Sequence, residues 1–395
     1  MPIQSAVAYS ENVNEPFEAG LEIGESIRQQ LALKAKSVGV LFCNIDFEPT
    51  ELLRGIAAKL DIPIIGCTTG NEANNHGYFE ESASLIVITG DDLQVGVGMG
   101  TELDQDMGKA VLQATTAARA MLGDHPPKLA LIFPDSTISR ISGDPVIQRI
   151  QAALGAGIPV VGGVSADNLR FKQTFQFCQG AVHSHALPIL LLGGDVHPVV
   201  VTRSGWLPVG EPARATKTAG ATLYEIDGRP ALDYIRRYIP NAEDLNVYIT
   251  YPLALIDEAV KPDGSRQFII RAPIEVDAAT GAITCLGDIP EGSLVQLTRG
   301  TRADVLNGVD DAIVTLKQRL AKREVSTLFF FSCVNRRMAL GLDTKKEIAM
   351  VLAQLGGACN VNGFYTYGEF GAIESGDGLQ AESKFHNSTL VLCAL

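Results

Sequence analysis

The sequence predicts an α/β protein with mixed sheets, arranged as two similar α/β modules with an internal pseudo-repeat. The chain has 395 residues, 46% hydrophobic and 19% charged, which is long enough to bury two cores. Apolar runs of strand length alternate with longer stretches of helical periodicity, which is typical of α/β layering. Because residues 204–214 are rich in turn-forming residues, we expect one module over residues 1–205 and a second over 206–395.

The first half is expected to be rich in strands, because its apolar runs are short and bounded by Gly, Pro, Asn or Asp. Strands are expected at residues 4–9, 38–43, 62–66, 84–89, 93–99, 128–133, 158–162, 173–178, 187–192 and 196–203. Apolar positions that recur with helical spacing predict helices at 17–33, 50–60, 106–122 and 144–155.

The second half begins with a predicted helix near 229–239 and strands near 245–250, 266–273, 281–286 and 293–297. A long helix near 302–322 is followed by an intensely apolar strand at 326–332. A helix near 344–355 and strands near 360–367 and 387–394 complete the chain.

One pattern recurs: a strand ends in glycine and a turn of small polar residues follows. It occurs at Gly66, at Gly162 and at Gly363, and the wider second spacing leaves room for a degenerate copy near residues 246–252. Glycine permits positive φ or close backbone approach, and Ser, Thr, Asp and Asn bond the liberated amides. Such turns either close strand–helix connections or line a pocket at the carboxyl ends of strands.

Composition and motifs exclude several classes of protein. A formal charge of −13 disfavours nucleic acid and anionic membranes as partners. The N-terminus lacks the pattern of a signal peptide, and no uninterrupted apolar run reaches the roughly 18 residues of a membrane helix, so we expect a cytoplasmic protein. Residues 96–100 resemble a dinucleotide fingerprint without its βαβ context. We expect no cofactor and no metal, since His183 and His185 have no apparent third ligand.

The C-terminal part supplies the residues of a candidate pocket. Arg336 is suited to an anionic group, Glu369 to an ammonium, and a tyrosine to the apolar part of a ligand. We therefore expect a site for an amino acid or a related polar metabolite. Its candidate residues are Cys333, Asn335, Arg336, Tyr365, Tyr367, Glu369, His386 and Asn387, with Thr68, Ser165 and Asp167 from the earlier turns.

Cys333 admits two interpretations. A thiol near a guanidinium and a helix N-terminus can have a lowered pKa and be reactive, and a pairing with His386 as nucleophile and base is conceivable. Alternatively, Cys333 is a buried packing residue. The seven cysteines contain no CxxC pair, so free thiols are expected throughout.

The sequence resembles the FIST family, a prokaryotic sensory module. The resemblance rests on residues 64–70, 160–167, 223–232, 331–336, 363–369 and 386–389. It implies an N-terminal and a C-terminal FIST module, a role in signal transduction and binding of amino acids or their derivatives. Family members are often fused to signalling outputs, and because none is found here, the output is expected to be a separate protein.

Three functions remain open on the sequence. The first is a small-molecule sensor, with an oligomeric state that the sequence does not predict. The second is an enzyme that uses Cys333 as nucleophile. The third is an interaction module whose turns, such as residues 71–81, bind another signalling protein without a ligand.

Overall fold

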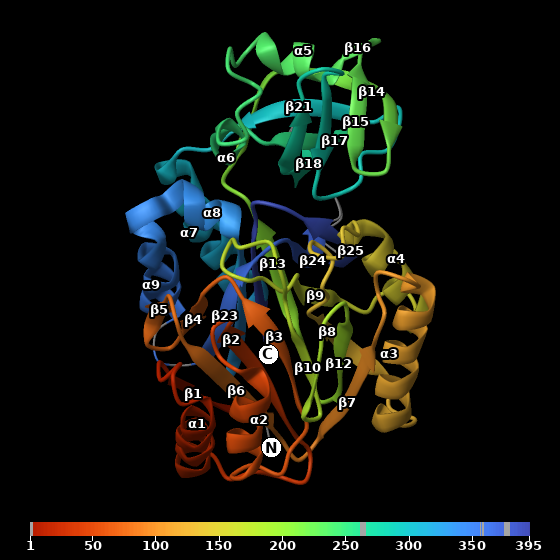
Figure 1. Cartoon of the computed structure of the whole chain (residues 1–395). Helices are drawn as coiled ribbons and strands as arrows, with labels where there is room; N and C mark the ends of the chain where they lie inside the picture. Colours follow the sequence, from red (N-terminus) through yellow and green to blue (C-terminus); the bar gives the residue numbers. More distant parts are fainter. Residues whose placement is uncertain (1–2, 261–265, 356, 358, 375–379) are drawn as a thin grey trace.

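A computed structural model describes residues 3–260, 266–355, 357, 359–374 and 380–395 of the chain. The predicted mixed α/β class is confirmed. Three six-stranded sheets with helices on their outer faces form a base, and a smaller β-rich cap domain (residues 207–299) lies above it (Figure 1). No helix in the described ranges is both long enough and apolar enough to cross a membrane.

The base contains three repeats of one element order: strand, helix, strand, one or more helices, then four strands. The first repeat comprises β1 (Gln4–Ser10), α1 (Pro16–Gln30), β2 (Ser37–Asn44), α2 (Pro49–Ala57), β3 (Ile64–Thr69), β4 (Glu72–Asn74), β5 (Gly77–Phe79) and β6 (Ala83–Thr89). The second comprises β7 (Leu93–Gly100), α3 (Met107–Leu122), β8 (Pro127–Ile132), α4 (Gly143–Leu154), β9 (Val160–Gly163), β10 (Gln176–Cys178), β11 (Ala181–His183) and β12 (Leu187–Gly194). The third comprises β13 (Val199–Arg203), α7 (Arg302–Leu320), β22 (Thr327–Cys333), α8 (Val334–Leu340), α9 (Thr344–Leu355), β23 (Asn360–Thr366), β24 (Glu369–Glu374), β25 (Gln380–His386) and β26 (Leu390–Ala394).

Each repeat gives a hairpin to a neighbouring sheet. The sheet orders are β1-β6-β2-β3-β10-β11, β7-β12-β8-β9-β24-β25 and β13-β26-β22-β23-β4-β5. The hairpin of the first repeat thus completes the third sheet, that of the second completes the first, and that of the third completes the second. This cyclic exchange joins the three repeats through backbone hydrogen bonds, so the base is one cooperative unit.

The recurring glycines lie at equivalent positions in the three sheets. Gly66 pairs with Leu41, Gly162 with Ile132 and Gly363 with Phe330, always on the neighbouring parallel strand. A Cβ atom would lie only 1.7 Å from the Leu41 oxygen at Gly66 and 2.0 Å from the Ile132 oxygen at Gly162. Close backbone approach, one of the two predicted reasons for glycine, is therefore confirmed.

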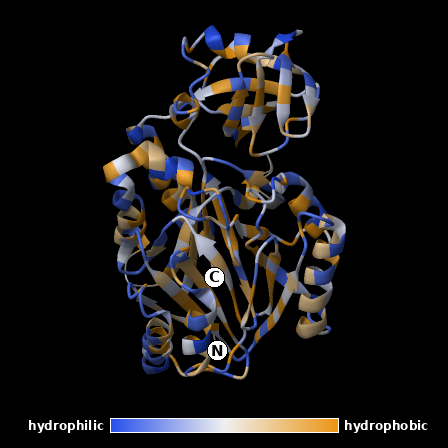
Figure 2. Ribbon diagram, in the orientation of Figure 1, coloured by the Kyte–Doolittle hydropathy of each residue, from blue (hydrophilic) through white to orange (hydrophobic). Residues whose placement is uncertain are grey.

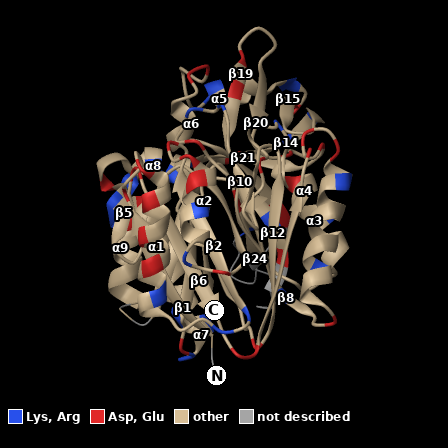
Figure 3. Cartoon of the chain, turned by 60° about the horizontal axis from the view of Figure 1, so that its bottom comes forward, with Lys and Arg blue, Asp and Glu red and all other residues tan. Residues whose placement is uncertain are grey.

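The inner faces of the sheets meet in an aromatic core. Phe42, Phe133 and Phe331 come from the ends of β2, β8 and β22, and their ring centroids lie 5.2 to 6.1 Å apart. All three side chains are fully buried. Apolar residues concentrate on these strands (Figure 2), whereas charged residues lie mainly on the helices and connections (Figure 3).

The outer helices pack closely where glycine or alanine faces them. Gly98 on β7 lies against α3, where a Cβ atom would come within 2.1 Å of the Ala114 oxygen. The Gly-rich run at 96–100 therefore seats a helix on a strand. This explains its likeness to a dinucleotide fingerprint by a packing requirement.

The cap domain is inserted into the third repeat between β13 and α7. It comprises β14 (Leu207–Ala219), β15 (Thr222–Ile226), β16 (Arg229–Pro230), α5 (Ala231–Arg236), α6 (Val247–Thr250), β17 (Leu253–Val260), β18 (Arg266–Arg271), β19 (Pro273–Asp277), β20 (Ala282–Cys285) and β21 (Leu294–Arg299). The strand predicted near 245–250 is wrong, and so is the degenerate copy of the turn at 246–252. This segment forms helix α6, whose Tyr248 is buried in the core of the cap domain.

Candidate functional site

A cavity of about 750 Å³ lies between the base and the cap domain. The base contributes residues 136–142 after β8, Leu169 and Phe171 after β9, Tyr367 after β23, and the start of α8. The cap domain contributes residues of α6, residues 272–275 around the start of β19 and residues 284–286 at the end of β20. Ligand sites in α/β proteins commonly lie at the carboxyl ends of parallel strands, and the cavity lies at the ends of β8 and β22.

Three of the predicted site residues line this cavity: Cys333, Asn335 and Tyr367. Asn335 connects the two domains, since its Nδ2 donates to Ser388 Oγ at 2.8 Å and to the Ile249 oxygen of α6 at 3.5 Å. Tyr367 stacks on Phe171, with ring centroids 4.6 Å apart and 12° between the planes. These three predicted residues therefore lie together on one wall of the cavity.

The Cys333 thiol lies at the wall of the cavity but is buried. It is 1% exposed, and burial, followed by the nearby carboxyl of Glu369, raises its pKa well above the ordinary value. The hypothesis of a lowered pKa is wrong, because the Arg336 guanidinium is directed elsewhere. His386 does not serve as its base, since its Nε2 faces the Gly371 oxygen at 3.1 Å and burial lowers its pKa to about 4.

Arg336 does not face the cavity. Its side chain is fully buried, Nη2 lies 2.6 Å from Glu347 Oε1, and Nε donates to the same oxygen at 2.7 Å. The remaining donors bond the backbone oxygens of Ser204 and Val305. The predicted role of Arg336 in binding an anionic ligand is therefore wrong, because its guanidinium is ion-paired with Glu347 within the third repeat.

Tyr365 and Glu369 are also engaged inside the base. Tyr365 is fully buried and donates from its hydroxyl to Glu347 Oε2 at 2.9 Å. Glu369 accepts from Thr366 Oγ1 at 2.5 Å and from Thr389 Oγ1 at 2.7 Å, and burial raises its pKa to about 7. A fully buried carboxyl with these partners does not meet a ligand ammonium, so the predicted role of Glu369 is wrong as well.

The other predicted residues shape the connections around the site. Asp167 accepts from the backbone nitrogens of Phe171, Lys172 and Gln173 and from the Tyr367 hydroxyl, so it fixes the loop that carries Phe171. Asn387 Oδ1 accepts from the Ala272 nitrogen at 3.2 Å and so joins the base to the cap domain.

Two smaller side chains hold the turns themselves. Thr68 Oγ1 accepts from the Phe175 nitrogen at 3.0 Å, and Ser165 Oγ donates to the Pro134 oxygen at 3.1 Å. Both are fully buried and neither lines the cavity, so their predicted roles as ligand-binding residues are wrong.

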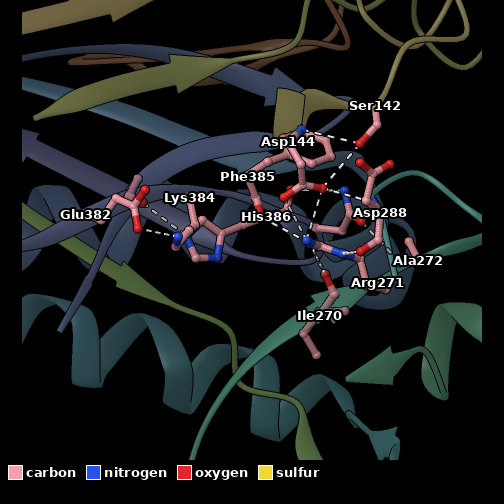
Figure 4. Close-up of polar contacts among 12 residues, drawn as sticks. Ser142, Asp144, Ile270, Arg271, Ala272, Asp288, Glu382, Lys384, Phe385 and His386 are labelled. Atoms are coloured by element: carbon pink, nitrogen blue, oxygen red, sulfur yellow. Dashed lines mark hydrogen bonds and ion pairs between the residues drawn. The ribbon is translucent and has the colours of Figure 1, made fainter. Parts of the chain in front are cut away.

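A buried ion pair that the sequence did not reveal holds the cap domain to the base (Figure 4). Arg271 of β18 places Nη2 at 2.9 and 3.1 Å from the two carboxylate oxygens of Asp144 in the first turn of α4. Its Nη1 and Nε also donate to the backbone oxygens of Phe385 and Asp288. The one sequence signal is an arginine at the end of an apolar strand, which gives no information about its partner 127 residues away.

A second titratable group lies beside the cavity. Asp135 is fully buried at the end of β8, and His185 Nδ1 lies 3.2 Å from its Oδ2. Burial raises the pKa of Asp135. Ser139 Oγ lies 2.9 Å from the same Nδ1, so both groups share one ring nitrogen and no Ser-His-Asp relay is formed.

The fold is that of a mixed α/β protein with an inserted cap domain and a partly open cavity between cap domain and base. The model of the FIST N domain matches residues 37–229 and that of the FIST C domain matches residues 231–372. The chain therefore belongs to the FIST family, as the motifs predicted. FIST domains are sensory-type domains of signal transduction.

The similar curated proteins are uncharacterized. One from Methanocaldococcus jannaschii is 25% identical over 62% of this chain and 52% of its own length, and one from Mycobacterium tuberculosis is 29% identical over 56% and 58%. The match thus spans little more than half the length of these relatives. A Mycobacterium bovis protein is 26% identical over 92% of both chains. A cyanuric acid hydrolase structure from A. caulinodans covers 100% of this chain and 99% of its own, with 8% identity and a TM-score of 0.37, too low to support an argument.

Proposed function

We propose that this chain is a small-molecule sensor of signal transduction, with its ligand site in the cavity between base and cap domain. The observation that carries the proposal is the position of the cavity, which both domains line at the carboxyl ends of two base strands. A ligand there contacts both domains at once, so its binding free energy acts on their relative position.

The proposal keeps two expectations from the sequence. The protein works in the cytoplasm, and a separate output protein reads the position of the cap domain. The resemblance implies a ligand of the amino-acid class, but the two residues that supported it, Arg336 and Glu369, are engaged inside the base. The class of the ligand is therefore argued separately below.

A metabolite screen by thermal shift tests the proposal, with Ala221→Trp as the occupied-cavity variant. Ala221 lines the cavity from the cap domain, and the added ring fills part of it. Ala117→Trp is the matched control, because Ala117 is exposed on α3. A ligand at about 100 times its Kd contributes about 2.7 kcal/mol of stability. We expect a compound that raises the Tm of wild type and of the control but not of Ala221→Trp; a folded protein that no compound stabilises would contradict the proposal.

A further inference from the structure

We propose that the ligand of this cavity is an uncharged, ring-bearing molecule with a mainly apolar surface; this rests on the proposed function. Most of the wall is apolar or aromatic. Side chains that carry it include Ile138, Leu169, Ile249, Leu286, Val334 and Met338. Burial of apolar ligand surface against such a wall is favourable, whereas a charge buried there finds no compensating interaction.

The wall of the cavity contains one positively and one negatively charged residue. Among the lining residues, Arg140 and Glu275 are charged, and both side chains are exposed. Exposed charges are hydrated and screened, so they hold a ligand charge weakly. A zwitterion would lose its hydration in the cavity, and no described residue that lines the cavity offers it a buried charge.

Two arginines that neighbour lining residues in the chain, Arg271 and Arg336, are already ion-paired. Arg271 lies next to the lining residue Ala272, but its donors go to Asp144 and to backbone oxygens. Arg336 follows the lining residue Asn335, and its donors go to Glu347 and to backbone oxygens. Neither guanidinium is directed at a ligand carboxylate.

Two carboxyl groups around the cavity are engaged, and a third is not. Asp167 receives three backbone N–H groups and the Tyr367 hydroxyl, and Glu369 is held by Thr366 and Thr389. A ligand ammonium would have to displace one of these partners, which leaves a buried polar group unpaired. Asp135 has His185 Nδ1 at 3.2 Å and no hydrogen bond from a described residue to either of its buried carboxyl oxygens, but burial raises its pKa and so favours the uncharged acid there.

The shape of one wall favours a flat ring. Tyr367 and Phe171 are stacked on each other, and Phe171 is 54% exposed, so its outer face is available for a further ring. Asn335 supplies a polar edge on the same side of the base: its amide nitrogen is bonded, and its oxygen is an acceptor. A ring with an N–H or O–H donor at one edge fits both features.

A series of four indoles isolates charge from shape. Indole-3-acetamide is neutral, indole-3-acetate is an anion, tryptamine is a cation and L-tryptophan is a zwitterion at pH 7. Kd values are measured by calorimetry with the full chain, and with Ala221→Trp and Ala117→Trp as blocked and control variants. We expect indole-3-acetamide to bind at least tenfold more tightly than the other three, and only Ala221→Trp to lose this binding.

Every other outcome overturns the inference about the ligand class. The outcomes differ in whether they still support the site and the proposed function. A charged indole that binds as tightly as the neutral one refutes the ligand class but supports the site, and tight binding of tryptamine would point to Asp135. If none of the four binds at millimolar concentration, the ring-bearing neutral class is refuted. The proposed function is then decided by the metabolite screen alone.

Discussion

Gln176 occupies in the second repeat the position that Glu369 occupies in the third. Gln176 pairs with Cys67 on β3, and Glu369 pairs with Gly163 on β9, each one residue beyond the repeat glycine. The side-chain oxygen of Gln176 accepts from the Ala186 nitrogen at 3.1 Å, as Oε2 of Glu369 accepts from the Thr389 nitrogen at 3.1 Å. The amide nitrogen of Gln176 donates to Ser165 Oγ at 2.9 Å.

The Gln176 amide indicates the protonation state of the carboxyl groups that take its place in the other two repeats, Glu72 and Glu369. Glu72 holds the same place in the first repeat, bonded to Thr69 and Ser82, and burial raises its pKa to about 8. A protonated carboxyl places an O–H donor beside an acceptor oxygen, as the glutamine amide places its N–H donors beside one. We therefore infer that at pH 7 the folded chain holds Glu72 mainly as the protonated acid and Glu369 as an acid that is about half protonated.

Glu369→Gln should make folding less sensitive to pH. The pKa of Glu369 is raised from 4.5 to about 7 in the folded chain, so its contribution is complete below about pH 4.5 and is lost as the pH rises through 7. Between pH 5 and pH 8.5, the free energy of unfolding of wild type should therefore fall by about 3 kcal/mol more than that of the variant. Urea unfolding at both pH values measures this difference.

The reverse change is its control. Gln176→Glu should introduce a loss of stability with rising pH, because the new carboxyl is equally buried. If wild type and Glu369→Gln changed in stability by the same amount between pH 5 and pH 8.5, the protonated state would be refuted.

Gly363→Ala should prevent the base from folding normally. A Cβ atom there would lie 1.7 Å from the Phe330 oxygen, which is backbone of the paired strand and cannot move away alone. Gly90→Ala is a matched control, because its Cβ atom would meet nothing closer than 3.4 Å. We expect loss of soluble folded protein for Gly363→Ala and a Tm within about 2 °C of wild type for Gly90→Ala. Equal circular-dichroism melting curves would contradict the close approach.

Arg336→Met should lower stability strongly because it leaves the buried Glu347 carboxylate without its cation. Both side chains are 0% exposed, and breaking a buried pair of this kind costs about 3–5 kcal/mol. Glu347→Gln in the same chain should recover part of the loss. A double-mutant cycle by urea unfolding measures the coupling; additive effects of the two substitutions would contradict it.

The sequence predicted what depends on local pattern. The apolar runs gave most of the base strands, and the glycines at 66, 162 and 363 gave the positions where the repeats coincide. The exchange of hairpins was not predictable, because Glu72 and Phe364, which pair across it, are 292 residues apart along the chain and carry no local signal. Segment 245–250 was misread because its short apolar run forms a helix, in which Tyr248 is buried in the cap domain and Ile249 lines the cavity.

Sequence reasoning placed three of the candidate residues beside one cavity, but it did not reveal the partners of the charged ones. Cys333, Asn335 and Tyr367 line the cavity because they follow strand ends, and strand ends are readable from sequence. The roles of Arg336 and Glu369 were not readable, since they are decided by Glu347 on α9 and by Thr389 before β26. A charged residue in a sequence does not show whether its partner is a ligand or a side chain.

Cys333 should react with a thiol reagent more slowly than Cys359. Burial and the Glu369 carboxyl keep the pKa of Cys333 far above neutral, whereas Cys359 is the partly exposed one of the seven cysteines. A labelling time course at pH 8 with mass-spectrometric mapping measures both rates. Faster modification of Cys333 would revive the hypothesis of a cysteine-dependent enzyme.

Arg271→Met should loosen the cap domain without unfolding the base. Arg271 and Asp144 are 3% and 12% exposed, and the pair is the charged contact that joins β18 to α4. Removing the guanidinium leaves the Asp144 carboxylate poorly solvated and also frees the backbone oxygens of Phe385 and Asp288. Hydrogen exchange at the two joints of the cap domain, residues 204–206 and 300–301, should therefore become faster, while β2 stays protected.

The matched control for the Arg271–Asp144 pair is Arg214→Met, which removes an exposed pair with Glu258 in the cap domain. Those side chains are 52% and 63% exposed, so the pair contributes less than about 1 kcal/mol. Exchange at the joints should then match wild type. If both arginine variants exchanged at the same rate there, the buried pair would not be what holds the cap domain over the cavity.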